Sequence, residues 1–286
     1  MAVVVAVHGI AQELKGLAQL HDEWWPALSD GLTLAKTSIP AEGLVCPSYG
    51  HLFRPAGSVR AQRTYYTANH IDDGEAELLG LIWQEAARVD QSVRSPDAEV
   101  RASTPKSVQA ALGALARSRF FAGLAESVFI GALKQVTGYL RDPWVRDEAQ
   151  KSVDAVVGPE TRVLVGHSLG SVVAYEALHR FDGRPNWANV RTLVTLGSPL
   201  GIPNIIFDRL VPKPSTGGRS RRVDRWSNIS DDGDVVALIK RLRPLFGDPV
   251  VDFRIDNGAK AHDVKPYLSA IETGRAIAAG LTRTGA

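Results

Sequence analysis

The chain has 286 residues, of which 44% are hydrophobic and 22% charged, the proportions of an ordinary globular protein with one large core. Its 33 Lys and Arg residues nearly balance 31 Asp and Glu residues, and a net charge of +2 argues against nucleic acid or an anionic membrane surface as a partner. The single cysteine, Cys46, excludes an internal disulfide framework. The N-terminus has no signal-peptide pattern and no apolar run reaches about 18 residues, so we expect a cytoplasmic protein without a transmembrane segment.

Six short runs rich in β-branched residues predict strands. In chain order they are Val3 to Val7, 43–47, Thr161 to His167, Val190 to Pro199, 222–231 and 250–256. The first, third and fourth are continuously hydrophobic, which is typical of strands buried on both faces of a parallel sheet. Helical segments lie between them at Asp22 to Leu34, Leu169 to Arg180, Asp234 to Leu242 and Val264 to Ala279. This alternation predicts an α/β fold with a doubly wound, mostly parallel sheet.

Residues 54–157 break the alternation, because they show helical periodicity and no convincing strand. In the stretch 72–93 helical spacing joins Leu78, Leu81, Ile82, Glu85 and Val89, and 107–140 is a longer apolar stretch. We predict a helical insertion, a cap or lid, on a core made of residues 1–53 and 158–286. The alternative is that some of these helices pack on one sheet face. Candidates for lining an apolar acyl pocket, if they are not simply buried core, are Phe120, Phe121, Phe129 and Ile130.

The segment "VLVGHSLGSVVAYEAL" carries the strongest chemical signal. Gly166 to Gly170 match G-x-S-x-G, with a predicted buried strand before them and a predicted helix after them. Glycines at the flanking positions leave room for a sharp turn that exposes Ser168, and the N-terminus of the helix favours a developing oxyanion. The pattern indicates a nucleophilic serine; the alternative is a glycine-rich turn that merely joins two core elements.

A serine hydroxyl needs a base to take its proton. The chain has seven histidines, His8, His21, His51, His70, His167, His179 and His262. In the order Ser, acid, His, only His179 and His262 follow Ser168. His179 falls on the helix that follows the serine, whereas His262 lies in a loop after the last predicted strand, where a base belongs. We therefore predict His262 as the base, against the alternative of a surface histidine that caps a helix.

The acid is expected after the fifth strand, in "SNISDDGDVVAL", where it would accept the imidazole N–H. Asp234 is favoured, Asp231 comes next and Asp232 third, and the other acids would cap a following helix. One backbone N–H of the segment His8 to Ile10 and that of Leu169 could form an oxyanion hole. His8 itself is expected to bond the local backbone. No metal site or cofactor motif is found in the sequence.

Several segments resemble the α/β-hydrolase superfamily, in its serine lipase and esterase branch. "VAVHGI", "VGHSLG", "VTLGSPL", "WSNISDDGDVVA" and "AHDVKPYL" are similar to the corresponding segments of bacterial and GPI-inositol-deacylase-like lipases. The resemblance covers the chain outside the insertion. It implies Ser168 as nucleophile, His262 as base, Asp234 as acid, and the N–H groups of Ile10 and Leu169 as the oxyanion hole.

The sequence thus predicts hydrolysis of a small-molecule or lipid-like carboxylic ester through an acyl-Ser168 intermediate, with no cofactor. An acyltransferase or thioesterase would use the same residues. A catalytically silent hydrolase fold that serves as a binding module is the alternative from another class, and it predicts the loss of at least one of the three residues. The apolar helices of the insertion could also open at a lipid interface, although a buried cap explains the same residues.

Overall fold

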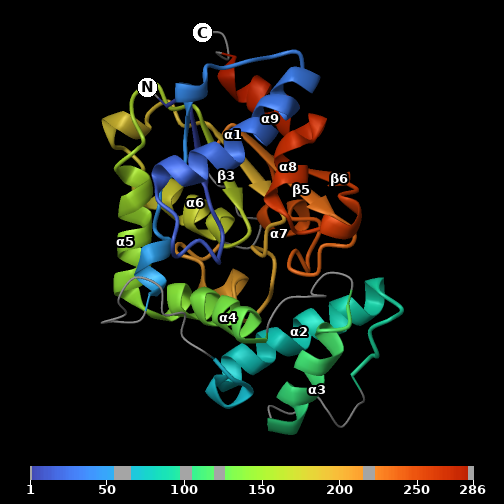
Figure 1. Ribbon diagram of the computed structural model, residues 1–286. Helices are drawn as coiled ribbons and strands as arrows, with labels where there is room; N and C mark the ends of the chain where they lie inside the picture. The colour runs from blue at the N-terminus through green and yellow to red at the C-terminus, as the bar shows by residue number, and fades with distance from the viewer. Residues whose placement is uncertain (1, 55–65, 97–104, 119–125, 215–222, 283–286) are drawn as a thin grey trace.

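The computed structural model describes residues 2–54, 66–96, 105–118, 126–214 and 223–282, and a six-stranded, all-parallel sheet forms its centre (Figure 1). The strands are β1 (Val4–Val7), β2 (Leu44–Val45), β3 (Val163–His167), β4 (Thr192–Leu196), β5 (Arg225–Asp231) and β6 (Val250–Ile255). Their order in the sheet is β2-β1-β3-β4-β5-β6. The prediction of an α/β fold with a parallel sheet is confirmed.

Helices cover both faces of the sheet, which explains the continuous hydrophobic runs. Val4 and Ala6 of β1 face a core shared with α1 (Leu17–Leu34), α8 (Val264–Ser269) and α9 (Ile271–Leu281). Val5 and Val7 face a second core shared with α5 (Pro143–Asp154) and α6 (Leu169–Arg180). The central strands β1, β3 and β4 therefore bury both sets of alternating side chains, whereas the edge strand β6 has exposed positions.

Within the described part of residues 54–157 the chain forms helices and no strand. These helices are α2 (Asp73–Val89), α3 (Pro105–Leu115), α4 (Glu126–Arg141) and α5. α5 packs against α6, α4 packs against α5 and α2, and α2 packs against α3. In Figure 1, α2 and α3 lie away from the sheet, with α4 between them and the rest of the molecule. Part of the segment thus covers a sheet face, and part extends beyond it.

The prediction of a helix over Asp234 to Leu242 is wrong. This segment is irregular, and among the described residues between β5 and β6 the only α-helix is the short α7 (Arg243–Phe246). The ammonium of Lys240 donates to the Asp234 carbonyl, and the side chains of Asn228 and Ser230 donate to the Lys240 carbonyl, both at 3.0 Å. Tertiary partners thus take the backbone groups that an α-helix would pair locally.

Two other helix boundaries differ from the prediction. The helix expected over Val264 to Ala279 is interrupted at Ala270, which is extended, because the Thr273 hydroxyl donates to the Tyr267 carbonyl at 2.6 Å. α1 begins five residues before the expected Asp22, after Gly16, whose position as N-cap offers no side-chain signal. Short 3-10 turns complete the chain at Ala41–Gly43, Gly50–Phe53, Ala68–His70, Pro185–Trp187, Phe207–Arg209 and Gly258–Lys260.

The strand order reverses its direction between β1 and β3. From β1 the chain passes outward to β2, then returns to β3 on the other side of β1 and continues to β6. Ligands of open α/β sheets bind at such a reversal, beyond the carboxyl ends of the strands. The segments that leave β1 and β3 here are Gly9 onward and Ser168 onward. Among the described residues, no helix is long and apolar enough to cross a membrane.

Candidate active site

Ser168 occupies a sharp turn between β3 and α6. Its backbone has φ 53° and ψ −129°, a left-handed conformation that non-glycine residues rarely adopt, and it is the N-cap of α6. A Cβ added to Gly166 would lie 2.5 Å from Ser171 Cα, and one added to Gly170 would lie 2.1 Å from the Val7 carbonyl oxygen. The flanking glycines are therefore required by the close packing of α6 against β1 and β3.

Ser168, His262 and Asp234 form one hydrogen-bonded chain. The Ser168 Oγ lies 3.0 Å from His262 Nε2, and His262 Nδ1 lies 2.8 Å from Asp234 Oδ2. Because an ionised carboxylate only accepts, His262 carries its proton on Nδ1 and offers Nε2 as an acceptor to the serine hydroxyl. The three side chains lie in the segments that follow β3, β5 and β6, although 94 residues of chain separate Ser168 from His262.

The Asp234 carboxylate is fully buried and held by further donors. Oδ1 accepts the N–H groups of Val236 at 2.9 Å and Ala237 at 3.2 Å, and Oδ2 also accepts the Tyr267 hydroxyl at 2.8 Å. Burial alone would raise the pKa of Asp234, but the neighbouring His262, its hydrogen bond, and Lys240 lower this pKa to about 2. The acid therefore stays ionised beside the imidazole.

Tyr267 was not predicted from the sequence. Its hydroxyl links the end of β5 to the acid, because it accepts the backbone N–H of Asp231 at 2.9 Å and donates to the Asp234 carboxylate. Gly197 after β4 completes this packing: its φ is +52°, and a Cβ there would lie 2.7 Å from Asp234 Oδ2. The motif "AHDVKPYL" contains Tyr267, yet nothing in its spacing indicates that the side chain returns to the acid.

The two alternative acids lie elsewhere. The Asp231 carboxylate accepts the N–H of Gly233 at 2.6 Å and that of Asn257, so it fixes the loops after β5 and β6. Asp232 is exposed and pairs with Arg254. Of the three acids, Asp234 is the one whose carboxylate contacts His262.

The two residues predicted to supply the oxyanion-hole N–H groups belong to segments next to Ser168: Ile10 follows β1, and Leu169 begins α6. A Cβ on Gly9 would lie 2.8 Å from Ser168 Cβ, so the end of β1 lies directly against the serine side chain. Leu169 is the first residue of α6, a position whose N–H has no partner within the helix. Among the described residues, neither N–H finds a hydrogen-bond acceptor.

His8 holds the peptide that carries the Ile10 N–H. His8 Nδ1 donates to the Gly9 carbonyl at 2.7 Å, its Nε2 accepts the Tyr49 N–H at 3.2 Å, and the two rings stack at 4.1 Å. Burial lowers the pKa of His8 to about 4, so the ring is neutral and keeps this tautomer. The carbonyl of the Gly9–Ile10 peptide points toward His8, which directs its N–H to the opposite side. As expected, His8 bonds the local backbone.

The other histidines do not reach the serine. Buried His167 donates from Nε2 to the His262 carbonyl at 3.0 Å, and desolvation, with the nearby His262, lowers its pKa to about 3. It therefore supports the His262 loop as a neutral ring. His179 packs against the Tyr175 ring at a centroid distance of 4.6 Å on α6.

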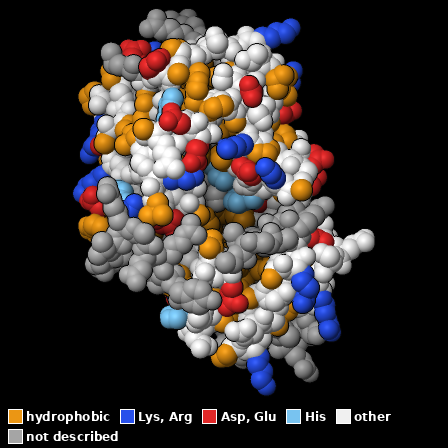
Figure 2. Space-filling model, in the orientation of Figure 1, with side chains coloured by type: hydrophobic (Ala, Val, Ile, Leu, Met, Phe, Trp, Pro, Cys, Tyr) orange, Lys and Arg blue, Asp and Glu red, His pale blue; other side chains and the backbone are white. Residues whose placement is uncertain are grey.

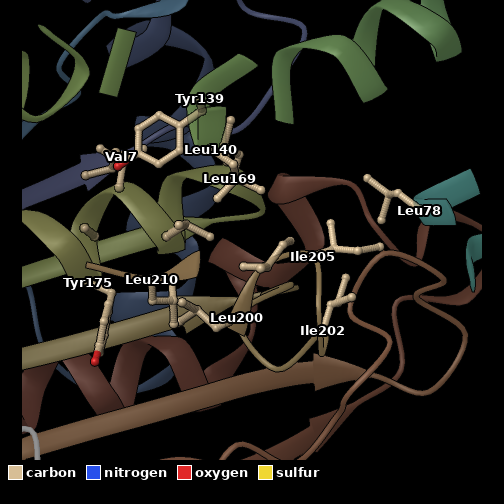
Figure 3. Close-up of a cluster of buried hydrophobic side chains, with 14 of the residues drawn as sticks. Val7, Leu78, Tyr139, Leu140, Leu169, Tyr175, Leu200, Ile202, Ile205 and Leu210 are labelled. Carbon is tan, nitrogen blue, oxygen red and sulfur yellow. The ribbon is translucent and has the colours of Figure 1, made fainter. Parts of the chain in front are cut away.

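Apolar side chains gather next to the site. Figure 3 shows Leu169 and Leu200 in the same buried cluster as Ile202 and Ile205 of the loop after β4, with Leu78 of α2 facing Ile205. Figure 2 shows histidine side chains in a hollow on the surface, between the sheet and the helices below it. Phe129 and Ile130 are buried in the same core, while Phe120 and Phe121 lie outside the described residues.

Across the described residues, no cluster of three or more His, Cys, Asp or Glu side chains could hold a metal ion. The chain was compared with family models, curated proteins and solved structures, and no match was found to any of them. The chemistry of the site therefore has to be argued from its geometry.

Proposed function

We propose that this protein is a serine hydrolase that cleaves a carboxylic ester. The observation that carries the proposal is the chain from Ser168 Oγ through His262 to Asp234, with distances of 3.0 and 2.8 Å. A nucleophile, a base and a group that orients the base stand within hydrogen-bond reach of one another, which is the arrangement that acyl transfer requires.

In the first half of the reaction, Ser168 Oγ attacks the ester carbonyl carbon while its proton passes to His262 Nε2. The carbonyl π electrons move onto oxygen, and the N–H groups of Ile10 and Leu169 stabilise the oxyanion. Asp234 stabilises the imidazolium through the hydrogen bond at Nδ1. The C–O bond to the alcohol then breaks, and the leaving oxygen takes the proton from Nε2, which leaves an acyl-serine.

In the second half, His262 takes a proton from a water molecule, which attacks the acyl-serine. The oxyanion forms again at the same two N–H groups, and Ser168 leaves with the proton returned by His262. The products are a carboxylic acid, an alcohol and the free enzyme.

The surroundings of the serine favour an ester with an apolar acyl group. Leucine and isoleucine side chains lie on the elements next to Ser168, namely α6 and the loop after β4. Leu78 brings α2 into the same cluster, so we propose that α2 and α4 act as a cap over the acyl group. A small-molecule or lipid-like ester fits this environment.

The test is turnover of p-nitrophenyl esters of graded acyl length by the wild-type protein and by Ser168→Ala. We expect measurable turnover that falls by about 10³-fold or more in Ser168→Ala, because one member of a cooperating set is removed. Ser152→Ala is the matched control, since the Ser152 hydroxyl donates only to the Glu148 carbonyl on α5. Unchanged turnover in Ser168→Ala, or no turnover of any chain length by the wild type, would contradict the proposal.

A further inference from the structure

A side chain from α4 holds the loop that follows β1. The Ala11 N–H donates to Gln135 Oε1 at 3.0 Å, across 124 residues of chain. Ala11 has φ 62°, a left-handed conformation that an alanine rarely adopts and that needs support from its surroundings. Gln135 is only 6% exposed, so this amide is committed to the contact rather than to water.

The orientation of the Gln135 amide follows from its partners. The Ala11 N–H can only donate, so it must face the amide oxygen, and the Gln135 Nε2 donates to the Glu13 carboxylate, which can only accept. Gln135 thus bridges two points of the same loop and satisfies both ends of its amide.

Ile10 lies between two residues whose backbone groups are hydrogen-bonded to side chains: Gly9 before it and Ala11 after it. Its preceding peptide is fixed by the hydrogen bond from His8 Nδ1 to the Gly9 carbonyl, and its following peptide by the bond from the Ala11 N–H to Gln135. Both backbone angles of Ile10 are therefore set from outside. The Ala11 N–H is already taken by Gln135, whereas the Ile10 N–H has no acceptor among the described residues and follows Gly9, which lies against the Ser168 side chain.

The helix that carries Gln135, α4, is bonded to α2 through Lys134 and to α6 through Tyr139. Lys134 pairs with Glu75 of α2 at 3.0 Å, and the Tyr139 hydroxyl donates to the buried Glu176 of α6 at 2.7 Å. Gln135 lies between these two anchors. Through Gln135, α4 is therefore hydrogen-bonded to the loop after β1.

We propose that Gln135 is a positioning residue that sets the Ile10 N–H, so that docking of α4 completes one half of the oxyanion hole. The inference rests on the proposed esterase function. Activity would then depend on how this helix sits, although Gln135 itself touches neither the ester nor the nucleophile.

The first test replaces the amide by a side chain of similar length without hydrogen bonds, Gln135→Met. We expect kcat to fall by about 10- to 100-fold with little change in KM, because a misplaced oxyanion donor weakens binding of the transition state only. The control is Gly138→Ala on the same helix, where an added Cβ meets nothing within 4 Å.

A second readout separates positioning from a general loss of structure. The ratio of kcat/KM for an ester to that for its thionoester should fall in Gln135→Met. Sulfur accepts the oxyanion-hole hydrogen bonds poorly, so loss of a donor lowers kcat/KM for the thionoester less than for the ester. A purely structural role would lower both rates and leave the ratio unchanged.

The most specific test exchanges the residues at positions 135 and 13 and asks whether the second substitution restores the activity lost by the first. Gln135→Glu still accepts the Ala11 N–H but sets its carboxylate against Glu13, whereas Gln135→Glu combined with Glu13→Gln restores both hydrogen bonds. We expect the single variant to lose kcat and the double variant to recover to within a few-fold of the wild type. This pair also decides the question if Gln135→Met does not fold.

The outcomes distinguish this inference from the proposed function. If Ser168→Ala abolishes turnover while Gln135→Met keeps the wild-type kcat and thionoester ratio, the inference is overturned and the esterase proposal stands. Equal kcat in the single and double exchange variants would overturn it as well. If Ser168→Ala keeps full activity, the esterase proposal itself fails.

Discussion

At the scale of single residues, the site depends on keeping one buried carboxylate charged and two buried imidazoles neutral. Asp234 accepts hydrogen bonds from His262, Tyr267 and the N–H groups of Val236 and Ala237, which replace the water it has lost. Burial lowers the pKa of His8 to about 4, so this imidazole stays neutral, and no carboxylate bonds it among the described residues. The negative charge of Asp234 thus lies beside His262, the histidine that would become an imidazolium during the proposed reaction.

The carboxylate of Asp234 is the first of these features that can be tested. In Asp234→Asn, the amide N–H₂ would face His262 and favour the tautomer protonated on Nε2, which cannot accept the serine proton. We expect ester turnover to fall by about 10⁴-fold, the loss typical of such a change. Steady-state kinetics with p-nitrophenyl esters provides the measurement.

Asp232→Asn is the matched control for Asp234→Asn, because Asp232 is exposed and pairs only with Arg254 among the described residues. Its turnover should stay within a factor of about two of the wild type, as expected for a weak surface ion pair. A large loss in Asp232→Asn with little loss in Asp234→Asn would reverse the assignment of the acid.

The buried neutral histidines predict how stability depends on pH. The pKa values of His8 and His167 are lowered to about 4 and about 3, while in the unfolded chain both titrate near 6.5. Between pH 6.5 and 4 the unfolded chain therefore binds more protons, and the free energy of unfolding falls as the pH falls. Each histidine adds about 1.4 kcal/mol per pH unit to this slope.

His167→Gln should remove one of these two contributions while keeping a donor toward the His262 carbonyl. Urea unfolding at pH 6.5, 5.5 and 4.5 measures the slope, and the variant should lose about 1.4 kcal/mol per pH unit relative to the wild type. Identical slopes in the two proteins would show that His167 is not neutral in the folded state.

At the scale of elements, the junction of β1 with α6 decides where the serine stands. The first turn of α6 packs so closely on the end of β1 that a Cβ on Gly170 would lie 2.1 Å from the Val7 carbonyl oxygen and 2.4 Å from that of His8. This contact places the segment that follows β1 against Ser168, because a Cβ on Gly9 would lie 2.8 Å from Ser168 Cβ.

Gly170→Ala should therefore push α6 and β1 apart. We expect a loss of about 1–3 kcal/mol in the free energy of unfolding, the range typical of overpacking, together with a loss of ester turnover. Gly138→Ala in α4 has open space and should gain up to about 1 kcal/mol from helix propensity. Urea denaturation of both variants tests the contrast, and a neutral Gly170→Ala would contradict the packing described here.

The helices and strands also show which parts of the structure could be predicted from the sequence. Strands β1, β3 and β4 were predictable because burial on both faces leaves continuous apolar runs, and Ser168 was placed correctly at a strand-to-helix turn by its glycines. The helix at Asp234 to Leu242 was predicted wrongly, because side chains of β5 capture its backbone groups. The contact between Gln135 and Ala11 spans 124 residues and follows from no local pattern.

At the scale of the whole molecule, the strand order brings distant segments to one edge of the sheet. β1 and β3 supply the loop of Ile10 and the turn of Ser168 at the point where the chain reverses its direction across the sheet, and β5 and β6 lead to Asp234 and His262. From the sequence, the order Ser, acid, His and the loop position of His262 selected Ser168 and His262, while Asp234 was favoured over Asp231 and Asp232. Their distances, and the support from Tyr267, depend on packing that only the folded chain reveals.

The central claim is that Ser168 is an activated nucleophile, and the most direct measurement is covalent labelling with a fluorophosphonate probe. Intact-mass spectrometry of the labelled protein should show a single adduct, and peptide mapping should locate it on Ser168. Ser168→Ala should remain unlabelled, and Asp234→Asn should react much more slowly. An adduct on a different serine, or a protein that turns over esters yet never reacts with the probe, would contradict the claim.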